Sequence, residues 1–279
     1  MKFVNTSIYD PGIPVEPWRG ATIPRIIHQT YPSIDLPDTL AKSTTALKET
    51  NPSWQHCLYD NAAIERFIYQ NYGSRVLATY KRINPVYGAA RADLFRYLLI
   101  YKVGGVYLDI KSSFSRPLDS VLSCNEGFVV SRWSNKKGQR YEGFGIRDEL
   151  PDLPEGELQQ WHVIAAPGHP FLKAVIDAVL KRIATYRPWR DGTGKPAVLK
   201  LTGPVIYTQT ILPLLSDYPC KIIENEQAIG LEYSVVSGEG HRNLFAQHYS
   251  LSRSSLVRPR GFASVLHLLW GTARTLKRR

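Results

Sequence analysis

Cysteine is scarce in this chain, and long apolar stretches are absent. Its 279 residues contain three cysteines, Cys57, Cys124 and Cys220, which are widely spaced and form no Cys-x-x-Cys pair. Such a set does not build a disulfide framework, so we expect a reducing compartment. No stretch approaches the roughly 18 uninterrupted apolar residues of a membrane span, and residues 1–14 lack the apolar core of a signal peptide. The sequence therefore predicts a cytoplasmic protein without its own membrane anchor.

Negative charge is also in short supply. The formal net charge at pH 7 is +11, while 43% hydrophobic and 21% charged residues are typical of a soluble globular chain. A positive balance favours anionic partners such as nucleotides, pyrophosphate-linked carriers, phospholipid surfaces or nucleic acid. Because lysine and arginine are dispersed and no nucleic-acid-binding motif is present, a nucleic-acid-binding protein is the less favoured alternative.

The most informative stretch is YGAARADLFRYLLIYKVGGVYLDIKSSF, residues 87–114. Apolar residues at helical spacing predict a helix over residues 89–102. Gly104 and Gly105 follow, and glycine tolerates the left-handed conformation in which helices commonly end. Residues 106–110 are apolar and β-prone, which predicts a buried strand of a parallel or mixed sheet.

Charged residues end this predicted strand. Asp109 and Lys111 are two positions apart, so strand alternation predicts that both side chains project from the same face. In open α/β sheets, ligands bind beyond the carboxyl ends of the strands. We therefore place the candidate site here.

The segments before this stretch alternate between strand and helix. We expect a strand within residues 23–32, a helix over residues 36–50 and a strand over residues 54–59. A second helix is expected to begin after Asp60, a good N-cap residue, and to end at Gly73. This alternation with short connections predicts a doubly wound α/β arrangement.

The later segments continue the pattern less regularly. We expect a strand over residues 127–133, then a strand and an amphipathic helix within residues 161–183, and strands at residues 220–223 and 228–235. The polar, glycine-rich segment 134–157 is longer than most loops, and such loops commonly serve as lids or acceptor-binding elements.

The central motif resembles the donor-site signature of glycosyltransferase family 32, the enzymes with a DXD-containing sugar-binding region. The family pattern is an Ala-x-x-(Ser/Ala)-Asp-x-x-Arg-Tyr helix followed by Tyr-x-x-Gly-Gly-(Ile/Val)-Tyr-x-Asp-x-Asp, which matches ARADLFRYLLIYKVGGVYLDIK, residues 90–111. IPRIIHQTY, residues 23–31, resembles the family's opening strand. One departure is Lys111, which stands where the family has the second acid.

The resemblance implies a GT-A-type, doubly wound (Rossmann-like) mixed sheet flanked by helices. It implies a retaining enzyme that moves a hexose from a nucleotide-diphosphate sugar, a UDP-sugar or GDP-mannose, to a glycan or lipid-linked acceptor. Asp93, Arg96 and Asp109 are its implied catalytic residues. The implied nucleotide-sugar-binding residues are these three together with His28, Gln29, Tyr31, Arg91, Gly105, Tyr107, Lys111, Thr202 and Gly203.

The resemblance also implies Mn²⁺ or Mg²⁺, with Asp109 and His248 as ligands, bound weakly or partly replaced by Lys111. Lys111 leaves open a second possibility, a catalytically impaired subunit that binds a sugar nucleotide. Gln160 stands near a family Asn position.

Simpler structural roles remain open for several of these residues. Asp93 and Arg96 have the spacing of a helix ion pair, and His28 and Tyr31 could be strand-end residues satisfied by the backbone. Thr202 could cap a helix whose first turn contains Pro204.

We expect three parts: an irregular N-terminal arm (1–21), a GT-A domain (22–255) and a basic amphipathic tail (256–279). The domain would divide into a nucleotide-sugar half (22–125) and an acceptor half (126–255). Within the tail, residues 265–279 have the composition of an interfacial helix, which predicts peripheral contact with an anionic membrane surface at its inner face. A helix docked on the domain would explain the same apolar stripe.

Overall fold

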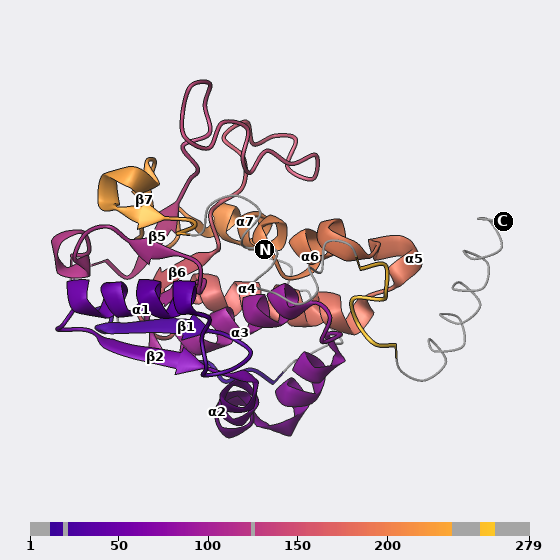
Figure 1. Cartoon of the computed structure of the whole chain (residues 1–279). Coiled ribbons are helices and arrows are strands. Elements are labelled where there is room, and N and C mark those ends of the chain that lie inside the picture. The colour runs from indigo at the N-terminus through magenta and orange to yellow at the C-terminus, as the bar shows by residue number, and fades with distance from the viewer. Residues whose placement is uncertain (1–11, 19–21, 124–125, 236–251, 260–279) are drawn as a thin grey trace.

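The computed structural model describes residues 12–18, 22–123, 126–235 and 252–259 (Figure 1). Within them, six strands form one sheet in the order β2-β1-β3-β6-β5-β7. These strands are β1 (Ile26–Thr30), β2 (Gln55–Tyr59), β3 (Gly105–Leu108), β5 (Phe128–Ser131), β6 (His162–Ala165) and β7 (Lys221–Ile223). β1 is parallel to β2 and β3, β6 is antiparallel to β3 and β5, and β7 is parallel to β5. The predicted mixed sheet is confirmed.

Seven α-helices are present in the described chain. They are α1 (Asp38–Thr50), α2 (Asn61–Arg82), α3 (Gly88–Val103), α4 (Pro170–Thr185), α5 (Pro188–Asp191), α6 (Gly194–Leu201) and α7 (Pro204–Ile211). Short 3₁₀ turns cover Leu118–Ser120, Leu212–Leu214 and Glu226–Ile229. A small second sheet pairs β4 (Ser113–Phe114) with β8 (Leu231–Glu232) in antiparallel fashion.

Alternation along the central strands supplies a hydrophobic core on each face of the sheet. In β3, Tyr107 belongs to the core that contains residues of α2, α3, α4, α6 and α7. Its neighbours Val106 and Leu108 belong to the opposite core, together with Leu47 of α1. Helices therefore flank both faces, as the fold prediction requires.

The second predicted helix is longer than expected. Asp60 caps it, since its Oδ1 accepts from the Ala63 N–H at 2.7 Å. At Gly73 the backbone leaves helical geometry (φ 75°, ψ 179°), but a further helical segment continues to Arg82. The predicted end at Gly73 marks a real break, and the segment after it was not predicted. Tertiary packing explains that segment, because Val76 and Tyr80 are buried in the core.

The central strand is shorter than predicted. Gly104 (φ 72°) and Gly105 (φ 101°) end α3 and begin β3, as the glycine pair predicted. β3 then stops at Leu108, and the chain turns, with the Ser112 N–H donating to the Asp109 oxygen at 2.8 Å. Strand alternation therefore does not govern Lys111, so the prediction that Asp109 and Lys111 share a strand face is wrong.

Segment 134–157 forms a folded loop without helix or strand, and it projects from the body beside β5 (Figure 1). The Asn135 amide donates to the carbonyl oxygens of Phe144 and Glu155, at 2.8 and 3.0 Å. Arg147 closes the loop through two contacts with the buried Glu157 carboxylate, at 2.7 and 3.0 Å. These hydrogen bonds and the Arg147–Glu157 ion pair fix the shape of the loop.

Among the described residues, no helix is long and apolar enough to cross a membrane. His248, residues 1–11 of the arm and residues 260–279 of the tail lie outside the described residues. Cys57 and Cys220 are free thiols.

Candidate active site

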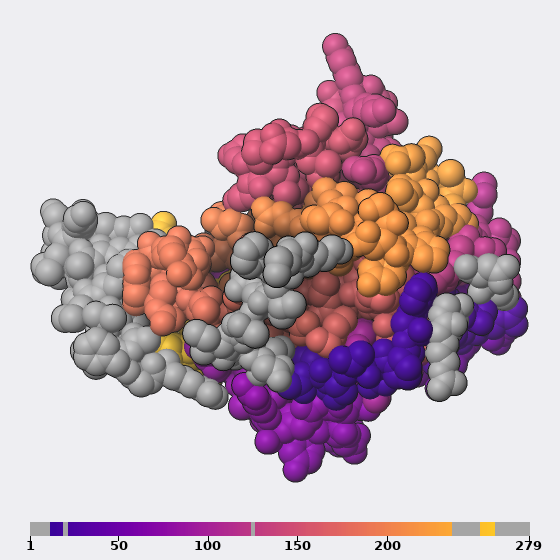
Figure 2. Space-filling view, turned by 180° about the vertical axis from the view of Figure 1, so that it is seen from behind, coloured from indigo at the N-terminus to yellow at the C-terminus, as the bar shows by residue number. Residues whose placement is uncertain are grey.

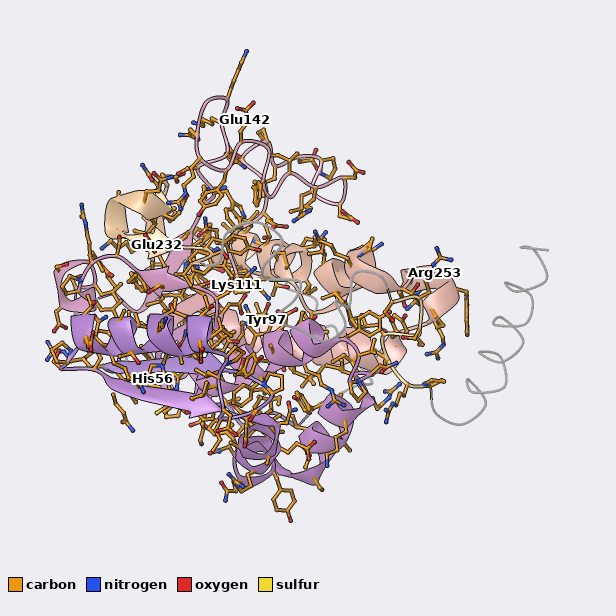
Figure 3. All side chains as sticks on the ribbon, in the orientation of Figure 1. His56, Tyr97, Lys111, Glu142, Glu232 and Arg253 are labelled. Carbon is orange, nitrogen blue, oxygen red and sulfur yellow. The ribbon has the colours of Figure 1, made fainter. Side chains whose placement is uncertain are left out.

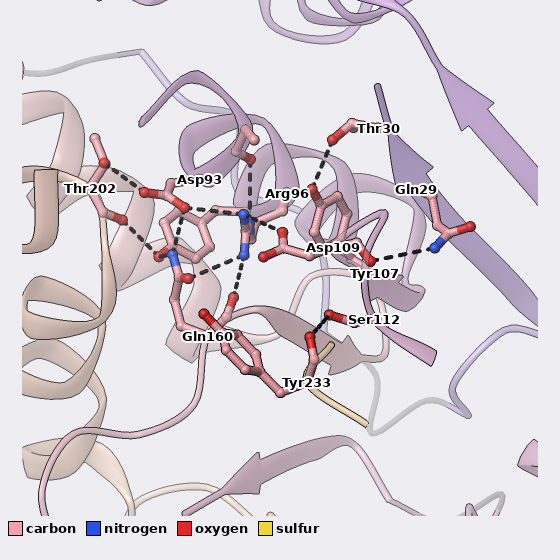
Figure 4. A network of polar contacts seen from close by, with 12 residues as sticks. Gln29, Thr30, Asp93, Arg96, Tyr107, Asp109, Ser112, Gln160, Thr202 and Tyr233 are labelled. Atoms are coloured by element: carbon pink, nitrogen blue, oxygen red, sulfur yellow. Dashed lines mark hydrogen bonds and ion pairs between the residues drawn. The ribbon is translucent and has the colours of Figure 1, made fainter. Parts of the chain in front are cut away.

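Asp109 begins the turn at the carboxyl end of β3, the edge where the sequence placed the site. Its backbone N–H donates to the Trp161 oxygen at 2.9 Å, which ties the turn to the segment before β6. Its carboxylate Oδ1 lies 2.8 Å from Nη2 of Arg96, and its side chain is 26% exposed while that of Arg96 is 3% exposed (Figure 4). The carboxylate of Asp109 is therefore within reach of a ligand.

Asp93 lies on the other side of the same guanidinium and is buried. Its Oδ1 lies 3.1 Å from Nη2 of Arg96 and accepts from the Gln160 amide at 2.9 Å. Its Oδ2 accepts from the Thr202 hydroxyl at 2.9 Å. Burial raises the pKa of Asp93, while Arg96 and these two donors oppose the rise. Both oxygens are in use, so in this arrangement Asp93 holds Arg96 in place.

Gln160, which precedes β6, links Asp93 to Arg96, although the sequence predicted no role for it. Arg96 Nη1 donates to both its backbone oxygen (2.5 Å) and its side-chain Oε1 (3.1 Å). Its Nε2 donates to Tyr97 Oη at 2.7 Å as well as to Asp93. The available signal was a glutamine immediately before a β-prone run, close to a family Asn position.

Arg96 packs over the Tyr107 ring, with 4.7 Å from its guanidinium carbon to the ring centroid. The Tyr107 hydroxyl in turn lies 2.9 Å from Thr30 Oγ1. Burial alone would lower the pKa of Arg96, but Asp109, Tyr107 and Asp93 outweigh it and raise the pKa. With both carboxylates ionised, one arginine faces two acids, and the cluster carries a net charge of about −1.

Lys111 lies beside the cluster in the turn after β3 (Figure 3). Its ammonium is 4.1 Å from the centroid of the Tyr233 ring, a cation–π distance. The backbone oxygen of Tyr233 accepts from Ser112 Oγ at 2.7 Å, and Val235 N–H donates to the Lys111 oxygen at 2.8 Å. The segment after β8 therefore holds Lys111.

The predicted site residues of β1 lie next to the cluster, but most of their polar atoms already have hydrogen-bond partners within the protein. His28 is buried, with Nδ1 3.1 Å from Tyr59 Oη and Nε2 3.1 Å from the Gly104 oxygen. Burial lowers the pKa of His28 to about 4, so its ring is neutral at pH 7. The Gln29 amide lies 3.5 Å from the Asp109 oxygen. Tyr31 follows β1 at a half-buried position.

The remaining predicted residues have packing roles. Arg91 donates through Nε and Nη2 to the Ile83 oxygen, at 3.0 and 2.9 Å, and so does not join the acid–arginine cluster. A Cβ at Gly105 would lie 2.6 Å from the Ile26 oxygen, so only glycine fits there. Gly203, not Thr202, is the N-cap residue of α7, with Pro204 in the first turn. The prediction that Thr202 caps this helix is wrong, because its hydroxyl donates to the Asp93 carboxylate instead.

The described residues contain no group of three or more His, Cys, Asp or Glu side chains that could hold a metal ion. Asp109 is the more accessible acid of the cluster, and His248 lies outside the described part of the chain. Mg²⁺ is commonly bound through one or two carboxylates together with substrate phosphates. A single carboxylate at Asp109 fits that mode of binding.

A buried acid–arginine pair and a second, partly exposed acid thus lie at the carboxyl end of a central strand, the edge at which open α/β sheets commonly bind ligands. Residues 37–128 match the family described as "Glycosyltransferase sugar-binding region containing DXD motif". This region includes α3, β3 and Asp109. The resemblance to the DXD glycosyltransferases is therefore confirmed.

Individual relatives are yeast mannosyltransferases. The chain is 32% identical over 104 residues to "Inositol phosphoceramide mannosyltransferase 3" of Schizosaccharomyces pombe, covering 37% of this chain and 28% of that protein. It is 26% identical over 213 residues to "Initiation-specific alpha-1,6-mannosyltransferase" of the same yeast, covering 70% and 50%. The chain thus spans half or less of the length of these relatives. Among solved structures, "PaToxG Glycosyltransferase" is 17% identical with a TM-score of 0.49 and covers 70% of each chain.

Proposed function

We propose that the chain is a retaining glycosyltransferase that moves a hexose from a nucleotide-diphosphate sugar to a glycan or lipid-linked acceptor. The observation that carries the proposal is Asp109, which is partly exposed at the end of β3, inside the region that matches the sugar-binding family, and ion-paired with Arg96 at 2.8 Å. The named activities of the yeast relatives favour mannose as the sugar. The donor would then be GDP-mannose, with a UDP-sugar as the alternative.

The charge of the cluster limits how the donor can bind. A diphosphate brings further negative charge to a cluster of two carboxylates and one arginine, so positive charge must accompany it, from a divalent ion and in part from the Lys111 ammonium. A divalent ion, Mn²⁺ or Mg²⁺, would supply that charge and stabilise the leaving diphosphate, with Asp109 and His248 as its protein ligands. The chain's own contribution is orientation, since Arg96 is buried and its contacts fix the carboxylate of Asp109.

The side of the site that binds the donor would be formed by Arg96, Asp93, Tyr107 and Thr202. Gln160 would align Arg96. His28, Gln29 and Tyr31 would line the approach of the nucleoside from β1. Positioning of this kind converts binding energy into rate only if the geometry is held tightly. The network of contacts at 2.5–3.1 Å around Arg96 favours such a role.

A second candidate function follows from Lys111. An ammonium at the position of the family's second acid repels a divalent ion, and Lys111 lies beside Tyr233 in the same turn as Asp109. A chain with a weakened ion site could serve as a sugar-nucleotide-binding subunit with little transfer activity of its own. Hydrolysis of the sugar nucleotide distinguishes the two functions.

The test is a thermal-shift and hydrolysis screen with UDP- and GDP-sugars, with and without Mn²⁺. A ligand that binds the folded state raises the Tm, by an amount set by its concentration relative to Kd. We expect stabilisation and slow hydrolysis with one donor, both lost in Asp109→Ala. Asp148→Ala, which removes an exposed acid of segment 134–157, is the matched control. If no sugar nucleotide stabilises the protein, the proposal fails.

The cellular setting and the domain limits remain part of this proposal. We place the enzyme in the cytoplasm, with residues 22–255 as its GT-A domain. Leu256 and Val257 pack into the core, so within the predicted tail (256–279) we propose residues 265–279 as the contact with an anionic membrane. Residues 22–125 would bind the nucleotide sugar and residues 126–255 the acceptor.

A further inference from the structure

Two adjoining cavities lie at the end of the molecule that carries α5, with volumes of about 160 and 320 Å³. Both include Arg82, at the end of α2, and Pro259 in their walls. Figures 1 and 2 show α5 beside the segment of residues 252–259, away from segment 134–157, which projects elsewhere on the surface. No residue of the acid–arginine cluster lines either cavity, so the two sites are separate.

The walls of these cavities are held by backbone contacts. Val257 forms an antiparallel bridge with Ile83, and the Arg258 N–H donates to the Arg82 oxygen at 2.8 Å. The Leu256 N–H donates to the Tyr186 hydroxyl at 3.2 Å, and both Leu256 and Val257 are buried. These contacts fix residues 256–258 against the body, and Val257 and Arg258 are part of the cavity walls.

The charge of the walls has one sign. Arg82 and Arg187 line the smaller cavity, and Lys81, Arg82 and Arg258 line the larger one. No acidic residue of the described chain lines either cavity. Acidic side chains contact these elements at two places: Glu65 pairs with Lys81 at 2.7 Å, and Asp191 pairs with Arg190 at 2.9 Å and accepts from the Arg187 N–H at 2.6 Å. Even with those acids counted, positive charge predominates.

An exposed indole completes the surface. Trp189 lines the smaller cavity and is 43% exposed, which is unusual for so large an apolar side chain. Arg253 lies at the same end of the molecule (Figure 3). Tryptophan favours the boundary between water and lipid, where its ring is apolar and its N–H remains hydrated. Arginine binds phosphate oxygens through two parallel donors.

We propose that this surface, formed by Arg82, Arg187, Trp189 and Arg258, binds the phosphate group of an anionic phospholipid. The arginines bind the headgroup, and the Trp189 ring enters the interface. This inference concerns a second site and goes beyond the proposed transfer reaction. It also differs from the contact predicted for residues 265–279, because Arg82, Arg187 and Trp189 belong to the folded body, and Arg258 is bound to that body through its N–H bond to the Arg82 oxygen.

The site is linked to the acid–arginine cluster through α3. Tyr87, which precedes α3, donates to the Ser254 oxygen at 2.6 Å, next to the wall formed by residues 255–258. Asp93 lies six residues further, or about 9 Å along a helix. A membrane bound at this end would therefore lie near the N-terminal end of α3, the helix that carries Asp93 and Arg96.

The experiment compares full-length protein with the Arg187→Gln/Arg258→Gln double variant in binding to phosphatidylcholine vesicles with and without phosphatidylglycerol. A basic residue at a membrane surface contributes roughly fivefold in affinity, so the double variant should bind anionic vesicles about 30-fold more weakly. The matched control is Lys137→Gln/Arg140→Gln, which removes the same charge from the exposed part of segment 134–157. The control should keep nearly wild-type binding.

Two further arms complete the test. Brominated anionic lipid should quench tryptophan fluorescence in the wild type, and Trp189→Phe should remove most of that quenching. If the double variant binds like the wild type while truncation after Arg260 abolishes binding, the tail alone is the membrane contact and the proposal is overturned. If vesicles do not bind but inorganic phosphate raises the Tm only when Arg187 and Arg258 are present, the ligand is a soluble phosphate and the lipid assignment is wrong.

Discussion

Arg96 contacts two carboxylates that differ mainly in how far water can reach them. Asp93 is buried with both oxygens bonded, whereas Asp109 is 26% exposed. The i,i+3 spacing of Asp93 and Arg96 predicted their ion pair, and the family pattern predicted that Asp109 would join them. The sequence did not reveal which acid would be buried, because Gln160 and Thr202 reach the site from elements 67 and 109 residues away from Asp93.

Gln160 offers a direct test of this network. Gln160→Leu removes the donor to Asp93 and an acceptor of Arg96 inside the protein, so we expect a loss of about 1–3 kcal/mol in the free energy of unfolding. Donor hydrolysis should fall as well, because Arg96 loses its alignment. Urea denaturation and donor hydrolysis measure the two effects.

The neighbouring residue supplies the control. Gln159 is also buried, but neither atom of its amide has a hydrogen-bond partner within the described structure. Gln159→Leu should be neutral or stabilising, since an unpaired buried amide is replaced by an apolar group of similar size. Equal losses in the two variants would mean that the contacts of Gln160 are not what stabilises the site.

Lys111 is the residue at which the sequence departs from the family. At 4 Å, repulsion between its ammonium and a cation would be of the order of 4 kcal/mol per unit charge in a medium of effective dielectric 20. We expect activity that needs more Mn²⁺ than a two-acid site and that partly survives a chelator. Lys111→Asp should tighten the dependence on Mn²⁺, as measured by metal titration of donor hydrolysis.

Lys111→Met is the companion variant, because it removes the charge and keeps a long side chain beside Tyr233. If the wild type loses all activity in chelator and regains it with trace Mn²⁺, Lys111 does not perturb the ion site. That result would also remove the argument for an impaired binding subunit.

At the scale of elements, local signals predicted α1, β2 and the start of α2 to within about two residues. Hydrophobic spacing and an Asp60 N-cap are local properties, so the sequence carries them directly. The continuation of α2 to Arg82 and the early end of β3 depend on partners elsewhere in the chain. The turn after β3 is held by contacts of Ser112 and Lys111 with Tyr233 and Val235, which no local pattern contains.

Gly73 lets α2 break without ending, and its replacement tests that role. Its φ of 75° with ψ of 179° is a region that essentially only glycine adopts, although a Cβ there would meet no atom within 4 Å. Gly73→Ala should therefore cost about 1–3 kcal/mol through backbone strain alone. Gly88→Ala, at the start of α3, also meets nothing within 4 Å and has no left-handed φ. It should be neutral or slightly stabilising in the same denaturation assay, and a similar loss at both positions would contradict the strain argument.

At the scale of the whole molecule, buried histidines connect the fold to pH. His28, His162 and His169 are at most 1% exposed, and burial lowers their pKa values to about 4, 3 and 4. All three are neutral in the folded protein at pH 7, while in the unfolded chain they bind protons below about pH 6.5. They lie in β1, in β6 and before α4, so protonation would destabilise both the sheet and its helical cover.

The sign of the effect follows from proton counts. Between about pH 6.5 and pH 4 the unfolded state binds more protons at these histidines than the folded state, so their contribution to stability is complete above pH 6.5 and is lost as the pH falls. Each contributes up to about 1.4 kcal/mol per pH unit in that window.

The raised pKa of Asp93, which burial causes, gives a pH dependence of stability in the opposite direction, so the comparison must isolate one histidine. His162→Gln, which keeps a polar atom near Ser131 Oγ but does not titrate, should reduce the pH slope of unfolding free energy between pH 6 and 4 by about 1 kcal/mol per unit. Urea denaturation at a series of pH values measures that slope, and an unchanged slope in the variant would show that His162 is not held neutral by the fold.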